Sequence, residues 1–333
     1  MIKKCMTNYR RAVTLAGFIL IVTLIGKALA GENSQVAIVT YISNNEQERV
    51  VKALVKSIRE LSGKYKDSKI YIVLGDSDDC PAVSLKGKNV NLVSLEMDSV
   101  FKNYPLAIKA FAAAQVEKIV RDKVQTLIWM DPGVIVLNSL DALKLDENYD
   151  VAVRPVTLLN NIGLAPGEKP NSYWAPIYQE NHLQDKPLPT IKTVADEVKI
   201  QQYYNCEVFS INPNLGICEK WAKVQTQLLK DENYQKTACT TFTRKLFLHQ
   251  AILSGVISAN IEPKRIKPLP ITSGYPFNQH EKLPKEKQVS TFNELSVVIF
   301  DFAWAKNPAW MNNIPVNEPL KQWLEDTYQE YLN

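Results

Sequence analysis

The stretch that most constrains the fold is residues 126–138, which contains two apolar runs separated only by Asp-Pro-Gly. Apolar runs bounded by turn residues are typical of strands buried on both faces of a parallel sheet. Asp131 then lies at the carboxyl end of the first run, where open α/β sheets bind their ligands. Burial of a lone carboxylate is costly unless it is paired, hydrogen-bonded or metal-bound. Asp131 is therefore a candidate site residue, and the alternative is that it only caps a turn.

Elements around this stretch alternate between strand and helix. Short apolar runs predict strands at 36–41, 70–74, 90–95 and 127–130. A capping-box sequence at 43–46 predicts a helix that ends before Gly63, and a second helix is expected from Pro105 to about Arg121. This alternation indicates a doubly wound α/β sheet.

The second half of the chain is less regular. Its pattern predicts strands at 151–153, 207–211, 256–261 and 297–300, and helices at 214–230, 242–255 and 320–332. Two proline-rich connections, 155–200 and 263–284, separate these elements, and the aromatic residues of the first argue against disorder. Because no linker divides the chain, we expect one domain at 31–333.

The first 30 residues have a different composition. Four basic residues between positions 3 and 11 precede an uncharged apolar run, 12–26, and an Ala-Leu-Ala sequence at 28–30. This is the pattern of a signal peptide, and the run is short for a membrane-spanning helix. We expect residues 1–30 to be cleaved and the protein to be exported, either periplasmic or secreted. The alternative is a signal anchor formed by residues 12–26, which would be the chain's one membrane contact.

Removal of this segment changes the charge of the chain. The 333 residues carry a formal net charge of +4, and five of the 39 basic residues lie in the first 30. The mature chain would hold 34 basic and 35 acidic residues, a net charge of −1. Nothing therefore indicates a nucleic-acid partner. A hydrophobic content of 46% supplies a sizeable core.

Four of the five cysteines remain after such a cleavage, namely Cys80, Cys206, Cys218 and Cys239. None has the C-x-x-C spacing of a zinc knuckle or redox motif. In an oxidising compartment they could form one or two disulfides, and sequence does not choose the pairing. The alternative is buried free thiols.

Five short motifs follow one another along the mature chain. The first ends the strand at 36–41, and the second is the Pro-Leu-Ala-Ile-Lys sequence at 105–109. They are followed by Trp-Met-Asp-Pro-Gly at 129–133, Tyr-Tyr-Asn-Cys-Glu at 203–207 and His-Gln-Ala-Ile-Leu at 249–253. In this order they resemble the motifs of GT-A-type glycosyltransferases, the nucleotide-diphospho-sugar transferase superfamily.

This resemblance covers most of the mature chain and implies a fold. The expected fold is α/β and GT-A-like, a mostly parallel Rossmann-like sheet flanked by helices, with an elaborated, loop-rich C-terminal half. Residues 31–154 would form the nucleotide-binding half, and residues 155–333 would form the acceptor-side half.

The resemblance also assigns roles to residues. Asp131, His249 and Gln250 are the implied catalytic residues, and the implied donor-binding residues are Thr40, Tyr41, Lys109 and Asp131. Candidate substrate-binding residues are Arg154, Trp174, Asn205 and Glu207. Two of these have alternatives: Arg154 could pair with Asp131, bind an anion or form a structural salt bridge, and core packing is the default interpretation of Trp174.

The metal-binding motif of the superfamily is incomplete in this chain. Transfer from a sugar diphosphate develops charge on the leaving phosphate, which Mn²⁺ or Mg²⁺ held by carboxylates would stabilise. The second Asp of the Asp-x-Asp motif is Gly133 here, Glu207 replaces a usual Gly, and His249 stands where Asp is usual. Asp131 together with His249 or His280 could rebuild a metal site.

Three functional hypotheses follow. The first is a glycosyltransferase that moves a sugar from a nucleotide- or lipid-phosphate donor to a glycan or another acceptor; a lipid-linked donor fits an exported protein better. The second is a catalytically inactive GT-A-fold protein that binds carbohydrate. The third is a hydrolase with paired carboxylates in the acidic run at 76–79, which is more simply a solvated loop.

Overall fold

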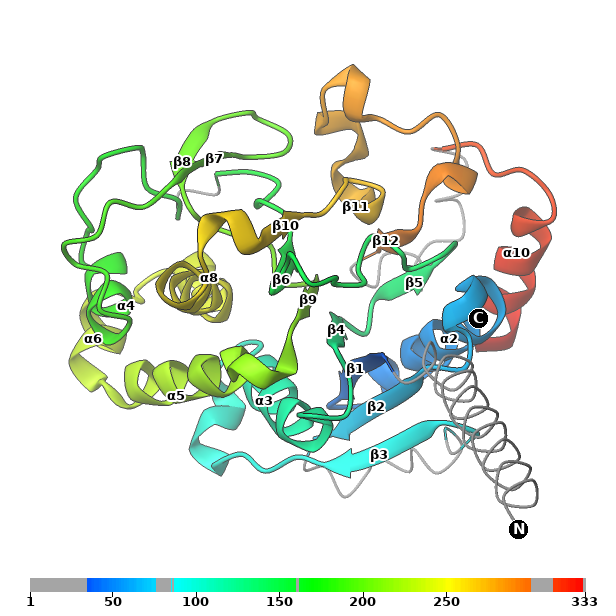
Figure 1. Ribbon diagram of the computed structural model, residues 1–333, viewed down its shortest axis with the longest axis horizontal. Coiled ribbons are helices and arrows are strands. Elements are labelled where there is room, and N and C mark those ends of the chain that lie inside the picture. Colours follow the sequence, from blue (N-terminus) through cyan, green and yellow to red (C-terminus); the bar gives the residue numbers. More distant parts are fainter. Residues whose placement is uncertain (1–34, 76–84, 86, 160–161, 301–313, 332–333) are drawn as a thin grey trace, which may run out of the picture.

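A seven-stranded sheet crosses the centre of the protein (Figure 1). The computed structural model describes residues 35–75, 85, 87–159, 162–300 and 314–331. The strands are β1 Val36–Ile42, β2 Lys69–Leu74, β3 Val90–Ser94, β4 Thr126–Met130, β6 Val151–Val153, β9 Val208–Ile211 and β10 Ile266–Pro268. They lie in the order β10-β6-β9-β4-β1-β2-β3, and only β9 runs antiparallel to its neighbours. The predicted α/β class with a mostly parallel sheet is confirmed.

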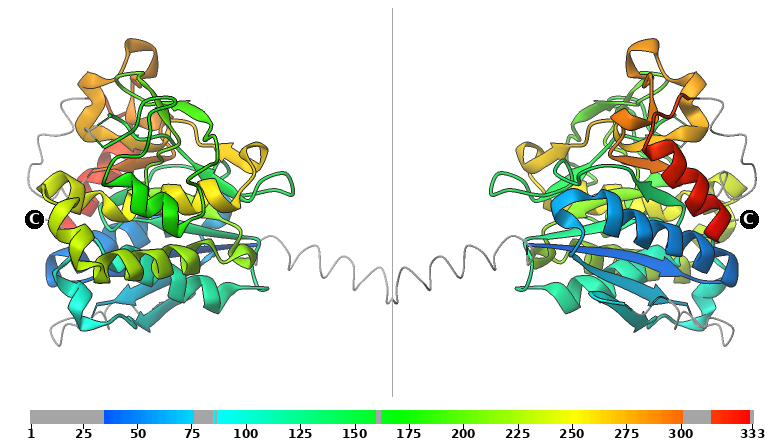
Figure 2. Two further views of the ribbon diagram at one scale, coloured as in Figure 1. Left: turned by 90° about the vertical axis from the view of Figure 1, so that its left-hand side faces the viewer. Right: turned by 90° about the vertical axis from the view of Figure 1, so that its right-hand side faces the viewer.

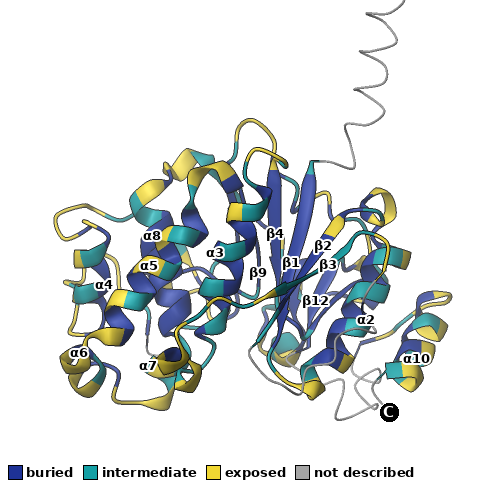
Figure 3. Cartoon of the chain, turned by 90° about the horizontal axis from the view of Figure 1, so that it is seen from below, coloured by how far each residue is buried: buried dark blue, intermediate teal, exposed yellow. Residues whose placement is uncertain are grey.

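Helices cover both faces of this sheet (Figure 3). One face carries α3 Ile108–Val120, α5 Ile217–Lys230 and α8 Leu248–Asn260, and the other carries α2 Asn45–Leu61. Strand β1 is buried along its whole length, with Ala37, Val39 and Tyr41 in the cluster on the α3 side and Val36 and Ile38 in the cluster on the α2 side. The alternation of side chains along a strand thus gives each helical layer its own core.

The C-terminal helix α10, Leu320–Tyr331, packs against α2 on the outside of the molecule (Figure 2). Its buried residues include Leu320 and Leu324, as its predicted apolar stripe requires. The connection at 155–200 also has structure of its own: it contains the helix α4 Trp174–Glu180 and a hairpin of β7 Thr190–Lys192 and β8 Lys199–Gln201. Two short helices, α6 Glu232–Thr237 and α7 Phe242–Leu246, precede α8.

A second, three-stranded sheet lies beside the first one. It consists of β5 Val134–Val136, β12 Val297–Ile299 and β11 Ser273–Pro276, in the order β11-β12-β5. The two apolar runs around Asp131 therefore belong to different sheets, β4 to the large one and β5 to the small one. The Val134 amide donates to the Asp131 carbonyl at 3.2 Å and closes the turn between them.

Some predicted elements are wrong. Residues 256–261, predicted as a strand, mostly continue α8, because a short apolar run is equally typical of a fully buried helix. The helix predicted at 242–255 is instead two helices, α7 and α8, that meet at Phe247. The helix α2 is capped by Asn44, which accepts from the Gln47 amide at 2.9 Å, one residue later than predicted.

Several predictions concern residues outside the described ones. These are the segment 1–30, the acidic run at 76–79 and Cys80. The three cysteines that the structure describes, Cys206, Cys218 and Cys239, are buried free thiols. None of the described helices combines the length and the apolar character needed to cross a bilayer.

An aromatic row crosses the α3 face of the sheet. Tyr41, Trp129 and Phe209 stack on neighbouring strands with centroid separations of 5.9 and 6.2 Å. Trp221 from α5 packs edge-on against Phe209 at 6.1 Å. Since Trp129 precedes Asp131 by two residues in β4, this row forms the core directly behind the end of that strand.

We predict that Phe209→Ala lowers the free energy of unfolding by about 3–5 kcal/mol, because it leaves a cavity between two buried tryptophans. The matched control is Phe242→Ala, since Phe242 is 72% exposed, and this change is expected to cost less than about 0.5 kcal/mol. Urea denaturation of both variants measures the difference. Equal stabilities would show that the aromatic row is not part of the core.

Candidate functional site

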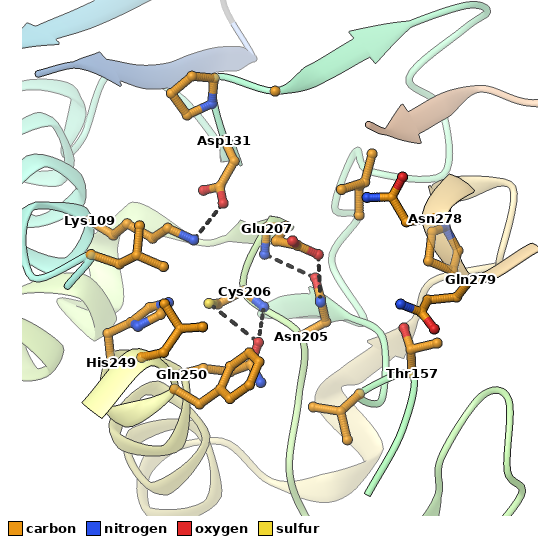
Figure 4. Close-up of a pocket in the computed structure, with 18 of the residues that line it drawn as sticks. Lys109, Asp131, Thr157, Asn205, Cys206, Glu207, His249, Gln250, Asn278 and Gln279 are labelled. Atoms are coloured by element: carbon orange, nitrogen blue, oxygen red, sulfur yellow. Dashed lines mark hydrogen bonds and ion pairs between the residues drawn. The ribbon is translucent and has the colours of Figure 1, made fainter. Parts of the chain in front are cut away.

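A cavity of about 420 Å³ opens at the carboxyl ends of β1 and β4, where the two sheets separate (Figure 4). Its walls come from the N-terminal part of α3, the 205–207 segment before β9, the start of α8 and the 3₁₀ helix at Phe277–Lys282. The side chains that converge on it include Lys109, Asp131, Asn205, Glu207, His249 and Gln250. Together with Tyr41, these are the predicted site residues that the structure brings together in this cavity.

Asp131 is fixed on every side. Its amide donates to the Glu207 carbonyl at 2.9 Å, which continues the β4–β9 ladder. One carboxylate oxygen, Oδ2, accepts from Lys109 Nζ at 2.5 Å, and the other, Oδ1, accepts from the indole Nε1 of Trp129 at 2.7 Å. The side chain therefore points into the cavity rather than capping the turn.

Lys109 is the ion-pair partner that stabilises this buried carboxylate. Its side chain is 2% exposed and that of Asp131 is 15% exposed, so the ion pair is largely removed from water. Burial raises the pKa of Asp131 to about 6, and the Lys109 ammonium opposes this rise. Burial also acts to lower the pKa of Lys109, but the acidic neighbours, Asp131 foremost, outweigh it and the pKa is raised. Lys109 is thus held as a cation.

The opposite wall is a hydrogen-bonded loop. Asn205 donates from Nδ2 to Glu207 Oε2 at 2.8 Å and accepts from the Glu207 amide at 2.9 Å. Gln250 accepts from the Cys206 amide at 3.3 Å and donates from Nε2 to the Tyr203 hydroxyl at 2.8 Å. These bonds orient Asn205 and Gln250 before any ligand arrives.

His249 lies beside this wall as a neutral imidazole. Burial, with a smaller contribution from the Lys109 charge, lowers the pKa of His249 well below its ordinary value. Its backbone carbonyl accepts from Trp221 Nε1 at 2.8 Å, which ties the start of α8 to the aromatic core. Its Nδ1 is buried without a hydrogen-bond partner in the described part of the chain.

Arg154 follows β6 just behind the cavity and is 3% exposed. The one hydrogen bond of its guanidinium within the described residues runs from Nη1 to Thr157 Oγ1 at 3.3 Å, and Nη2 is buried without a partner there. Burial lowers the pKa of Arg154 to about 10, while Glu207 acts in the opposite direction. The suggested ion pair with Asp131 is wrong, because Asp131 is already bound to Lys109.

A second cavity of about 430 Å³ adjoins the first one. It lies over the ends of β1 and β2, where Ser43, Gln47 and Gly75 line it. Tyr41 and Leu106 line both cavities. Leu106 has a φ of 55°, a left-handed conformation that is strained for a residue with a side chain.

Three predicted residues lie elsewhere. Trp174 is 1% exposed in the core and donates from Nε1 to the Ile162 carbonyl, so core packing explains it. His280 is bonded through Nδ1 to the Tyr275 hydroxyl at 2.5 Å and does not line the cavity with Asp131. Thr40 is fully buried and lines neither cavity.

The cavity also contains residues that sequence reasoning missed, namely Thr157, Asn278 and Gln279. All three come from the proline-rich connections. The polar Phe-Asn-Gln-His sequence at 277–280 was a signal, but only the pairing of β11 with β12 shows that it folds back to the cavity.

As arranged, these residues do not fit a divalent cation. Both oxygens of Asp131 accept from nitrogen donors, and Glu207 Oε2 accepts from Asn205. Within the described ranges, no cluster of three or more His, Cys, Asp or Glu residues could hold a metal ion. Mn²⁺ and Mg²⁺ need several oxygen ligands, and a neighbouring ammonium group opposes a second cation.

Comparisons with known proteins find likeness only among solved structures. No protein-family model and no curated protein sequence matches the chain. It is similar to the galactosyltransferase LgtC in complex with donor and acceptor sugar analogues, with 13% identity, 89% of this chain and 96% of that chain covered, and a TM-score of 0.48. It is also similar to the bifunctional glycosyltransferase WbbM, with 14% identity, 91% of this chain and 53% of that chain covered, and a TM-score of 0.47. A third similar structure is mouse xyloside xylosyltransferase 1, with 10% identity, 80% of this chain and 97% of that chain covered, and a TM-score of 0.40. At these identities the activity has to be argued from this chain's own site.

We predict that the Asp131 carboxyl titrates near pH 6, above the ordinary value for Asp. Lys109→Met should raise this pKa further, because it removes a cation that favours the carboxylate and leaves the effect of burial. Carbon-13 NMR of the carboxyl groups measures both values. Lys118→Met, on the exposed side of α3, is the control and should leave the titration unchanged. A wild-type titration near pH 4 would contradict the buried position of Asp131.

We also predict that Arg154→Met raises the free energy of unfolding by about 1 kcal/mol or more, because it removes a buried, under-bonded charge. Arg265→Met is the control with the opposite sign, since Arg265 pairs with the nearly buried Asp150. Urea denaturation of the two variants compares them. A loss of stability in Arg154→Met would mean that the guanidinium serves the fold.

Proposed function

We propose that this chain is a glycosyltransferase that takes a sugar from a phosphate-activated donor and passes it to a glycan or another acceptor. The observation that carries this proposal is the pair of adjoining cavities at the carboxyl ends of the parallel strands. Their volumes of about 420 and 430 Å³ lie in the range of small-molecule sites. A nucleoside base or a lipid chain in the second cavity and a sugar in the first would be joined by a phosphate near Tyr41 and Leu106, which line both cavities.

The polar groups of the first cavity suit a sugar. Carboxylates and amides bind hydroxyl groups by accepting and donating hydrogen bonds. Glu207 supplies a carboxylate, and Asn205, Asn278 and Gln279 supply amides around the same space. Gln279 Oε1 is buried and without a partner in the described chain, so it has an acceptor to offer.

The chemistry assigned to the cavity is displacement at the anomeric carbon. The acceptor hydroxyl attacks this carbon, the bond to the donor phosphate breaks, and the phosphate leaves with the electron pair. Glu207 is the cavity carboxylate without an ion-pair partner among the described residues, and we assign it the proton of the acceptor hydroxyl. To Lys109, the ammonium beside Asp131, we assign stabilisation of the negative charge that develops on the phosphate.

The donor and the location belong to the same proposal. LgtC is described with donor and acceptor sugar analogues, and we propose that this chain likewise binds both kinds of sugar. If the segment 1–30 directs export, a lipid-linked phosphate is the donor that would be present in the periplasm or outside the cell. An anchor at 12–26 would keep the cavity close to such a lipid.

A second candidate, a carbohydrate-binding protein without transfer activity, is favoured by one observation. Both oxygens of Asp131 are satisfied within the protein, so the carboxylate has little capacity left for a ligand or a metal. Binding of oligosaccharides without turnover of any sugar donor would favour this candidate.

We predict that the purified full chain releases phosphate leaving group from a UDP-hexose, a GDP-hexose or a polyprenyl-phosphate hexose in the presence of acceptor glycans. Glu207→Gln should lower kcat by about 10²–10⁴-fold, because it removes the assigned base. Glu286→Gln, an exposed glutamate, is the control and should keep the wild-type rate. Full activity of Glu207→Gln would refute this role, and no turnover with any donor would refute the transferase.

A further inference from the structure

We propose that the Lys109 ammonium takes the place of the divalent cation in this site, so that the donor phosphate is bound without a metal. The inference rests on the proposed function, because it concerns the phosphate of the sugar donor. It departs from the metal-dependent site that the sequence motifs implied, and it follows from how the side chains around Asp131 are bonded.

The position that a cation would take at Asp131 is already filled. A metal at Asp131 would have to approach the carboxylate oxygens, and Lys109 Nζ and Trp129 Nε1 lie on them at 2.5 and 2.7 Å. Figure 4 shows the Lys109 side chain pointing at Asp131 across the cavity wall. The residue that would supply a second carboxylate is Gly133, which has no side chain.

Among the described residues, no other set of metal ligands replaces the missing carboxylate. The Glu207 carboxylate is held by Asn205, and His249 lies close enough to Lys109 for the two to interact electrostatically. A metal between Asp131 and His249 would therefore have to displace a buried ammonium. The cost of leaving that charge unpaired opposes the exchange.

Lys109 also has hydrogen-bond donors that the described residues do not use. A lysine ammonium carries three N–H donors. One of them serves Asp131, and none of the described residues accepts from the other two. Because Lys109 lines the cavity, these donors are available to the oxygens of a phosphate. A charged hydrogen bond to an oxyanion in a site shielded from water is stronger than one in solution.

The charge balance of the cavity wall also favours a bound phosphate. Asp131 compensates Lys109 while the cavity holds no ligand, which allows the ammonium to remain charged although it is 2% exposed. When a phosphate binds, the ammonium faces two anions, Asp131 and the phosphate, as a metal ion held by a carboxylate would. The single charge of Lys109 suits a phosphate of low charge, such as a lipid-linked phosphodiester, better than a nucleoside diphosphate.

The test measures phosphate binding and metal binding separately. Uridine diphosphate and farnesyl phosphate are titrated calorimetrically into the full chain, first in EDTA and then with excess Mn²⁺. Electron paramagnetic resonance of Mn²⁺ is recorded on the same protein without any phosphate. We expect no protein-bound Mn²⁺, binding of at least one phosphate compound in EDTA, and affinities that change less than twofold with Mn²⁺. The stronger ligand identifies the source of the phosphate.

Variants test the role of Lys109 itself. Lys109→Met should weaken phosphate binding at least tenfold in EDTA, and Lys118→Met on the same helix should leave it unchanged. The double variant Lys109→Met/Asp131→Leu removes both charges and guards against misfolding from an unpaired carboxylate; it should also lose the phosphate.

Two kinds of contrary result distinguish a failure of this inference from a failure of the proposed function. A tenfold gain in phosphate affinity with Mn²⁺, or unchanged binding in both Lys109 variants, would overturn the inference and leave the transferase standing. A failure of both phosphate compounds to bind in either buffer would overturn the proposed function together with the inference.

Discussion

The Lys109–Asp131 ion pair is the interaction on which the site depends. A buried pair of charges is favourable only if its geometry is good and the remaining hydrogen-bonding capacity is satisfied. Here Asp131 directly follows β4 and Lys109 lies in α3, and Trp129 donates a hydrogen bond to the second carboxylate oxygen of Asp131. Trp129 in turn is stacked between Tyr41 and Phe209. The position of the two charges is thus fixed by the core rather than by a mobile loop.

The cavity itself exists because the chain changes sheets at Asp-Pro-Gly. Strand β4 belongs to the large sheet and β5 to the small one, and the turn between them lines the cavity. Leu106, which lines both cavities, has a left-handed conformation that costs about 1–2 kcal/mol for a residue with a Cβ. Backbone strain of this kind persists only where packing enforces it, and it gathers at functional sites. Leu106 lies at the boundary that a ligand spanning both cavities would cross.

The sequence predicted features that depend on a single element, and it predicted poorly those that depend on contacts between elements distant in the chain. The strands through β4 and the placement of Asp131 could be predicted, because the short apolar runs there are bounded by turn residues. Residues 256–261 could not, since an apolar run in a buried helix has the same composition as a buried strand. Gln279 was missed because it reaches the cavity through the small sheet, and Thr157 was missed because it lies in the proline-rich connection that follows β6 of the large sheet. Trp174 was misplaced for a related reason: aromatic residues in a loop-rich stretch fill cores as readily as they bind sugars.

Several residues with backbone strain or unused hydrogen-bonding groups cluster around the cavity. The fold is otherwise consistent: the large sheet is fully buried along β1 and β4, and the aromatic row is closely stacked. Yet a strained Leu106, an ammonium with two unused donors and the under-bonded guanidinium of Arg154 all lie within or just behind its walls. Sequences that specify one structure satisfy local and global preferences together, and they depart from this rule mainly at functional sites. The surrounding core stabilises the fold enough to permit the energetic cost of these features. Their concentration at the ends of β1, β4 and β6 therefore argues for a working site more strongly than any single residue does.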